Sequence, residues 1–93
     1  MINGNPHDFM DRIYTGQDTT FVFEQKKYWF QGYTENGVAH MEIFQYYPET
    51  NEDYLWACDS ESMEKCMRAF ESAKIFSGKS FWEVEREIEW IDE

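Results

Sequence analysis

Basic side chains are scarce in this sequence: 8 Lys and Arg stand against 19 Asp and Glu, and the formal net charge is −11. Carboxylates in such excess repel phosphate groups, which argues against direct binding to nucleic acid or to an anionic membrane. No apolar run approaches the ~20 residues that a membrane-spanning helix needs. Residues 1–8 contain no basic region followed by an apolar segment, so we expect no signal peptide and a cytoplasmic location.

Cysteine and the known catalytic motifs are also rare or missing. The two cysteines, Cys58 and Cys66, fit reduced thiols in a cytoplasmic protein better than a disulfide. The sequence has no CxxC, no HxxxH and no His/Cys cluster, so we expect no metal site. It also has no glycine-rich phosphate loop and no nucleophile signature. We therefore expect a protein that is not an enzyme and that uses no cofactor.

Aromatic residues, in contrast, are abundant. They make up 19% of the chain, as 4 Trp, 6 Tyr and 8 Phe. Acidic chains that fail to fold usually contain few aromatic residues, so this composition indicates a folded protein. Its length of 93 residues is that of one domain, which we expect to span residues 1–93.

The first half of the chain predicts one helix followed by antiparallel strands. Asn5 and Pro6 are a typical N-cap and first helical residue for a helix over residues 6–14, which Gly16 ends. Segments rich in aromatic and β-branched residues predict strands over 19–24, 28–34 and 38–47, with a short fourth strand over 54–58. Residues 25–27 read as a polar turn, and Asn36-Gly37 is typical of a type I′ hairpin turn.

The second half predicts two helices. Asp59 or Ser60 caps the first of them, on which Met63, Cys66, Met67 and Phe70 form one apolar stripe. Ser80 and Glu83 fit a capping box that begins a helix over 81–91. Residues 82–90 also alternate between apolar side chains and Glu, so a strand is the alternative there. The fold class is then α+β: an N-terminal helix, a three- to four-stranded antiparallel meander, and two C-terminal helices packed on one sheet face.

The negative charge is concentrated in two segments. Residues 49–64, the first acidic run, carry six carboxylates and no basic residue, which gives −6. Residues 81–93, the second acidic run, carry six carboxylates and Arg86, which gives −5, so the remaining residues balance to zero. Either these runs form a solvated face or they form a surface that binds a partner. For the second case we predict these contact residues: Glu49, Glu52, Asp53, Asp59, Glu61, Glu64, Glu85, Glu89, Trp90 and Asp92.

The aromatic residues are predicted to occupy both faces of the sheet. Alternation along the second strand places Tyr28 and Phe30 on one face, and Trp29 and Tyr33 on the other. Helices can cover only one face of a small sheet, so the other face should expose rings, which are typical of protein interfaces. A homodimer through this face is one alternative. On a helix, Trp90 points away from the apolar stripe, so we expect it to be exposed or at an interface.

A small acidic domain with the order helix, antiparallel meander, helix, helix resembles the small type II anti-CRISPR proteins of phages and mobile elements. Some members of that group act as DNA mimics and occupy the PAM-reading site of an RNA-guided nuclease, where arginines otherwise read DNA. The resemblance covers the whole chain in element order and charge. It rests on no shared motif, so it assigns no functional residue in this sequence.

These observations lead to three functional hypotheses. The first is an inhibitor that presents carboxylates to a basic, nucleic-acid-binding site of a partner protein such as an RNA-guided nuclease, because carboxylates pair with arginine much as phosphates do. The second is an immunity or antitoxin protein that blocks a nuclease toxin, which needs the same acidic surface. The third is a non-enzymatic assembly protein that buries its uncovered sheet face in an oligomer.

Overall fold

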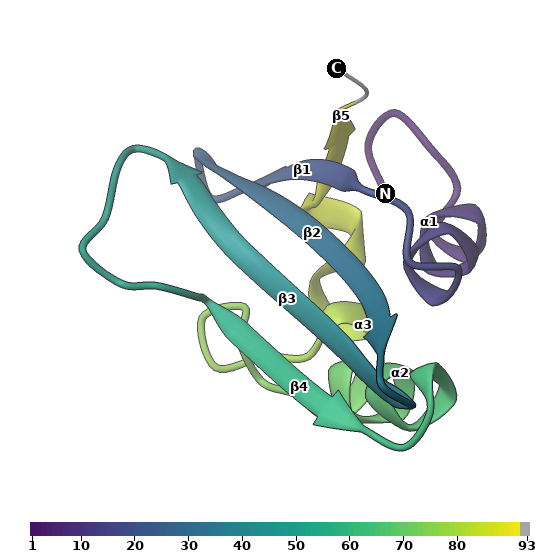
Figure 1. Cartoon of the computed structure of the whole chain (residues 1–93). Helices are drawn as coiled ribbons and strands as arrows, with labels where there is room; N and C mark the ends of the chain where they lie inside the picture. The colour runs from purple at the N-terminus through teal and green to yellow at the C-terminus, as the bar shows by residue number, and fades with distance from the viewer. Residues whose placement is uncertain (92–93) are drawn as a thin grey trace.

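A five-stranded antiparallel sheet is the centre of the structure, a computed structural model that describes residues 1–91. Its strands are β1 (Thr19–Phe23), β2 (Lys26–Glu35), β3 (Val38–Tyr47), β4 (Trp56–Ser60) and β5 (Glu89–Ile91), in the spatial order β4-β3-β2-β1-β5. The first four strands form the predicted meander, although β4 covers residues 56–60 and not the predicted 54–58. β5 extends the sheet along the free edge of β1 (Figure 1). The α+β class is therefore confirmed.

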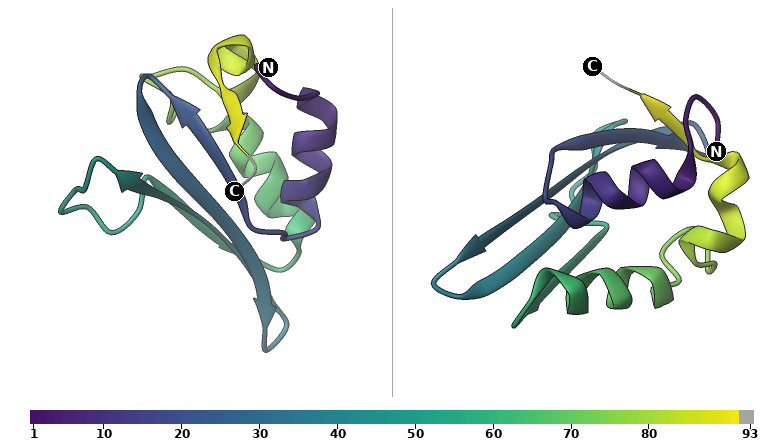
Figure 2. Two further views of the ribbon diagram at one scale, coloured as in Figure 1. Left: turned by 90° about the horizontal axis from the view of Figure 1, so that it is seen from above. Right: turned by 90° about the vertical axis from the view of Figure 1, so that its right-hand side faces the viewer.

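Helices cover one face of this sheet. They are α1 (Pro6–Tyr14), α2 (Met63–Ser72) and the single-turn α3 (Phe81–Val84), which a 3-10 turn over residues 85–87 follows. The Asn5 side chain caps α1 as predicted, because its Oδ1 accepts hydrogen bonds from His7 N at 2.8 Å and Asp8 N at 3.3 Å. Both views in Figure 2 place the helices on the same side of the sheet. Within residues 1–91, no helix is long and apolar enough to cross a membrane.

Two tight turns set the register of the meander. Asn36 and Gly37 have φ of 53° and 78°, the left-handed pair that a type I′ turn requires, as the sequence predicts. For the turn between β1 and β2, the sequence predicts residues 25–27, and this prediction is wrong. Glu24 and Gln25 adopt the positive φ angles, so Lys26 already pairs with Phe23 across the hairpin.

The start of α2 also differs from its prediction. We expected Asp59 or Ser60 as the cap, but Ser62 holds this position, and its Oγ accepts a hydrogen bond from Lys65 N at 3.3 Å. The reason is that β4 continues to Ser60, which pairs with Ala39 of β3, so the chain is still extended there. The predicted stripe of α2 is confirmed in register, since Cys66 and the residues at 67 and 70 are buried.

The predicted helix over residues 81–91 is wrong beyond its first turn. It begins as expected, because the Glu83 carboxylate accepts hydrogen bonds from Ser80 N at 3.1 Å and Ser80 Oγ at 3.0 Å. These bonds hold the pKa of Glu83 below its ordinary value. The chain then becomes extended and Trp90 pairs with Phe21 of β1. Pairing satisfies backbone groups along the β1 edge that a longer helix would leave unpaired.

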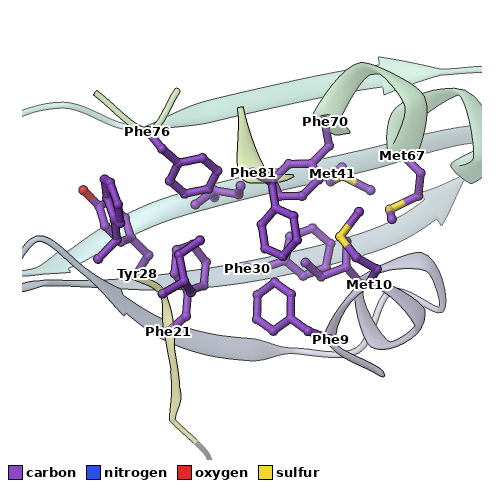
Figure 3. Close-up of a cluster of buried hydrophobic side chains, with 14 of the residues drawn as sticks. Phe9, Met10, Phe21, Tyr28, Phe30, Met41, Met67, Phe70, Phe76 and Phe81 are labelled. Carbon is purple, nitrogen blue, oxygen red and sulfur yellow. The ribbon is translucent and has the colours of Figure 1, made fainter. Parts of the chain in front are cut away.

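The core between the sheet and the helices is built mainly from phenylalanine rings (Figure 3). Six of these rings have 0–1% of their surface exposed: Phe9, Phe21, Phe30, Phe70, Phe76 and Phe81. Phe81 stacks on Phe9 at a centroid distance of 5.5 Å and lies 5.8 Å from Phe70, so one residue of α3 joins α1 to α2. Cys66 is completely buried here and is a free thiol, as expected.

Candidate protein-binding surface

The face of the sheet opposite the helices, which we call the open face, is uncovered by secondary structure. In Figure 1 the strands lie in front of α2 and α3, so the view is onto this face. Alternation along the strands assigns side chains to it. They are Thr20 and Val22 of β1, Trp29, Gln31 and Tyr33 of β2, Val38, His40, Glu42 and Phe44 of β3, and Ala57 and Asp59 of β4.

Aromatic rings form the apolar part of the open face. The Trp29 and Phe44 centroids are 5.5 Å apart, and Phe44 lies 4.9 Å from Tyr54 of the β3–β4 loop. The Tyr33 ring stacks on His40 at 4.7 Å. Eight large hydrophobic side chains of residues 1–91 are exposed, and five of them lie on this face or at its margin: Trp29, Tyr33, Val38, Tyr47 and Tyr54. This concentration confirms the predicted uncovered aromatic face, and such a patch is typical of a contact surface.

A nearly buried carboxylate, Glu42, lies at the centre of the open face. Only 8% of its surface is exposed, although it lies on the uncovered side of the sheet. Its Oε1 accepts a hydrogen bond from Gln31 Nε2 at 3.2 Å, across the β2–β3 pair. The same carboxylate raises the pKa of the exposed Tyr33 and Tyr54. Burying a carboxylate in an aromatic surface costs free energy unless hydrogen bonds or charges compensate it.

Four carboxylates converge on these two tyrosines. Desolvation, the charge of Glu42 and a hydrogen bond with it raise the pKa of Tyr33, and Glu35 and Asp59 raise it further. For Tyr54, the hydrogen bond with Glu42 is the largest cause of a raised pKa, followed by the charge of Glu42, desolvation and the charges of Asp53 and Asp59. We call this group the tyrosine–carboxylate patch: Tyr33, Glu35, Glu42, Asp53, Tyr54 and Asp59.

The first acidic run is divided between three places. Asp53 and Asp59 belong to the tyrosine–carboxylate patch, and Asp59 Oδ1 lies 2.6 Å from His40 Nδ1. Glu61 and Glu64 lie at the start of α2, where they form ion pairs with Lys65 at 2.9 Å and Arg68 at 2.8 Å. The remaining two predicted residues, Glu49 and Glu52, line a pocket at one end of the sheet.

The second acidic run lies at the opposite edge of the sheet. Glu85 Oε2 accepts a hydrogen bond from the amino group of Met1 at 2.7 Å, and Glu89 accepts one from Asn3 Nδ2 at 3.0 Å. Both carboxylates thus hold the N-terminal residues against the last strand. The predicted contact residue Asp92 lies outside the described residues. Because β4 and β5 are the two edges of the sheet, with three strands between them, the structure does not bring the two runs together.

The sequence predicts that Trp90 is exposed or at an interface, and the structure places it differently. Trp90 lies on β5 and not on a helix, and its ring is partly buried against the core. It meets Phe9 edge-on at 5.5 Å, and the Arg12 guanidinium lies 6.0 Å above it. The extended backbone turns the ring inward beside Phe21, with which Trp90 pairs. Trp90 therefore contributes to the packing of the core.

Sequence reasoning missed Glu42 and Glu35 because it looked for runs of charge. Both residues fall in the part of the chain whose charges balance to zero. The signal that could have found Glu42 is alternation along β3, where it shares a face with His40 and Phe44. A carboxylate between an imidazole and a phenyl ring is unusual for a solvated position on this strand, because Ala39, Met41 and Ile43 on its other face are buried and apolar.

Glu42→Gln tests how the patch is organised. This change keeps the shape of the side chain but removes the negative charge, so we expect the pKa of both Tyr33 and Tyr54 to fall toward the ordinary value of 10.0. The raised folded-state pKa values stabilise the native protein below about pH 10, and this stabilisation is lost as the pH rises through them. As the pH rises above 10, the free energy of unfolding of the variant should therefore fall less than that of the unmodified protein.

The measurement is an NMR titration of ¹³C-labelled tyrosines, combined with unfolding curves at several alkaline pH values. Glu87→Gln is the matched control, because Glu87 is exposed and distant in the fold, on the turn before β5. Unchanged tyrosine pKa values in the Glu42→Gln protein would show that Glu42 does not organise the patch.

Within residues 1–91, no group of three or more His, Cys, Asp or Glu side chains is placed to hold a metal ion. No protein-family model matches the chain, and no curated protein and no solved structure is significantly similar to it. The open face therefore has to be interpreted from its own chemistry.

Proposed function

We propose that this protein is a non-enzymatic inhibitor that binds the basic, nucleic-acid-binding site of another protein, such as an RNA-guided nuclease. The observation that carries the proposal is the tyrosine–carboxylate patch on the uncovered aromatic face of the sheet. Its carboxylates offer bidentate acceptors to arginine, as DNA phosphates do. The neighbouring rings of Trp29, Phe44 and Tyr54 offer the apolar contact area that slows dissociation.

The proposed contact surface is smaller than the one the two acidic runs would make together. Glu61, Glu64 and Glu85 already have partners within the chain, so they have less negative charge to offer to another protein. In the patch, Asp53 is exposed and Asp59 faces a histidine and not a fixed cation. The DNA-mimic hypothesis therefore rests on the open face and on the β4 edge beside it.

Competition with DNA tests the proposal. A type II RNA-guided nuclease loaded with its guide is mixed with a labelled duplex that carries its PAM, and the protein is titrated in. We expect the duplex to be displaced, and the inhibition to weaken as salt is raised from 0.05 M to 0.5 M, because salt screens charge pairs. A basic nuclease toxin in the same assay tests the immunity-protein alternative. If the protein displaces DNA from neither nuclease at any concentration, the proposal is wrong.

A homodimer through the open face is the second candidate, and the exposed rings of Trp29, Tyr47 and Tyr54 favour it. A dimer held by aromatic contacts should persist at 0.5–1 M salt, where the screening length is only about 3–4 Å. Light scattering across that range distinguishes the candidates. A stable dimer at high salt that displaces no DNA would replace the inhibitor proposal with an assembly role.

A further inference from the structure

A pocket of about 360 Å³ opens at the end of the sheet, away from the centre of the open face. It lies where the β1–β2 turn, the β3–β4 loop and the segment before α3 meet, so its walls come from parts far apart in the sequence. Its volume is at the lower end of the range for pockets that bind small ligands or single side chains. Glu49 and Glu52, two of the predicted contact residues, contribute to its rim.

The polar wall of the pocket is mostly negative. It contains the carboxylates of Glu24, Glu49 and Glu52, and Lys26 is the one basic residue of the lining. The Ser77 hydroxyl donates a hydrogen bond to Glu24, which fixes that carboxylate. Two further bonds hold the loop that carries the other carboxylates, from Gln45 Nε2 to Pro48 O at 2.8 Å and from Glu52 N to Thr50 Oγ1 at 3.3 Å.

Tyr28 is the second and independent observation. Its side chain is buried, with only 5% exposed, yet its hydroxyl has no hydrogen-bond partner among residues 1–91. Its ring stacks on Phe21 at 5.3 Å, and Figure 3 shows the hydroxyl at the outer end of the ring, turned away from the phenylalanine cluster. Glu24 and Glu52 line the same pocket as Tyr28, and burial together with the charges of these two carboxylates raises the pKa of Tyr28.

We propose that this pocket receives the guanidinium group of an arginine side chain from the protein partner. The proposal rests on the proposed function, because the open face would bring the partner to the pocket. Guanidinium is a planar cation with five N–H donors and no acceptor, which matches a pocket lined by three carboxylates and a tyrosine. The apolar residues of the lining, Phe23, Leu55 and Ile75, provide a surface for the arginine methylene groups.

The position of the pocket fits a partner that also covers the open face. The β3–β4 loop contributes Glu49 and Glu52 to the pocket, while Asp53 and Tyr54 of the same loop belong to the tyrosine–carboxylate patch. One bound protein that covers the open face and continues around this end of the sheet can therefore contact both regions. An ammonium group would use fewer of these acceptors, since lysine presents a compact point charge and not a planar fork.

The test uses N-acetyl-arginine amide as the probe and the ¹⁵N-labelled full chain at low salt. We expect chemical-shift changes confined to residues 23–28, 45–55 and 75–77, with a dissociation constant on the order of 1 mM for so small a ligand. The citrulline analogue, which has the same shape without the charge, should bind at least about tenfold more weakly. The lysine analogue should also bind more weakly.

Variants distinguish binding in the pocket from attraction to the overall negative charge of the protein. Glu49→Gln with Glu52→Gln should weaken probe binding about tenfold or more, and Tyr28→Phe should weaken it about threefold to tenfold, as expected for one lost hydrogen bond. Glu87→Gln removes an exposed carboxylate elsewhere and should leave binding unchanged. Spectra of each free variant verify that the fold is intact.

The outcomes for the pocket and for the proposed function are distinguishable. Shift changes spread over the whole surface, or equal binding of the citrulline analogue, would overturn the arginine pocket. If the protein displaces DNA from the nuclease but the probe does not bind, the arginine pocket is also overturned, while the proposed function stands. Probe binding confined to the pocket supports the arginine pocket even if no nuclease loses DNA, and then the proposed function is the part that fails.

Discussion

Replacing Phe81 with alanine is expected to lower the free energy of unfolding by about 3–5 kcal/mol, out of the roughly 5–15 kcal/mol typical of a domain. The Phe81 ring is fully buried and contacts rings from three different segments, Phe9 of α1, Phe70 of α2 and Phe76 before α3. Alanine leaves a cavity that these elements cannot close together, because each is also fixed to the sheet.

Urea unfolding monitored by tryptophan fluorescence measures this loss. Trp82→Ala is the matched control, because Trp82 is the next residue and a large ring, but it lies at the surface against His7 and Glu71. We expect Trp82→Ala to lower the free energy of unfolding by about 1 kcal/mol or less, apart from the loss of the contact with His7. If Phe81→Ala does not fold, Phe81→Leu should fold with a loss of about 1–2 kcal/mol. Equal losses at positions 81 and 82 would contradict the role of Phe81.

The helix, the meander and the α2 stripe were predictable because their signals are local. Asn5 and Pro6 determine the start of α1, and Asn36-Gly37 determines the β2–β3 turn, without reference to the rest of the chain. The stripe that contains Cys66 is read directly from its spacing. In each case, the preference of a few neighbouring residues agrees with the global fold.

The C-terminal segment was predicted incorrectly because its structure depends on a strand that is distant in sequence. Residues 81–84 follow their capping box into a helix, but residues 89–91 pair with β1, more than 65 positions earlier. The glutamates of this segment favour a helix locally. Edge pairing with β1 and burial of Trp90 against Phe9 outweigh that preference, and neither contact is visible in the local pattern.

The candidate site was predicted only in part, for a related reason. Counting charge along the chain identifies Asp53 and Asp59, but it groups them with Glu61 and Glu64, which form ion pairs with basic residues of α2. A strand distributes neighbouring residues over two faces, so a run of charge in sequence is not a patch in space. The carboxylate at the centre of the site, Glu42, is not part of either acidic run.

The location of Glu42 argues for function over stability. An apolar residue at this central position of β3 would avoid burying a charge among the rings of the open face. A buried carboxylate contributes little to folding compared with a hydrophobic residue of similar size. Surfaces that bind partners often retain such groups at a cost in stability.

Reversing the charge of Asp53 and Asp59 to lysine together is expected to weaken binding to the nuclease that passes the DNA-competition test by about 100- to 1,000-fold. Each reversal removes one charge-assisted hydrogen bond of about 1.5–3 kcal/mol and places a cation opposite the partner's arginines. Both residues are exposed, so the free energy of unfolding should change little. Calorimetry at fixed salt measures the binding, and urea unfolding measures the stability.

The matched control is reversal of Glu61 and Glu64 to lysine, which changes the net charge by the same amount at the start of α2. These two glutamates are also exposed, but they pair with Lys65 and Arg68 of α2, so their reversal should cost only a few tenths of a kcal/mol in stability. Bulk electrostatic steering predicts the same loss of affinity for both double variants. A placed surface predicts a large loss for the first pair and a small one for the second. Equal losses would therefore show that the net charge of −11, and not the open face, governs binding.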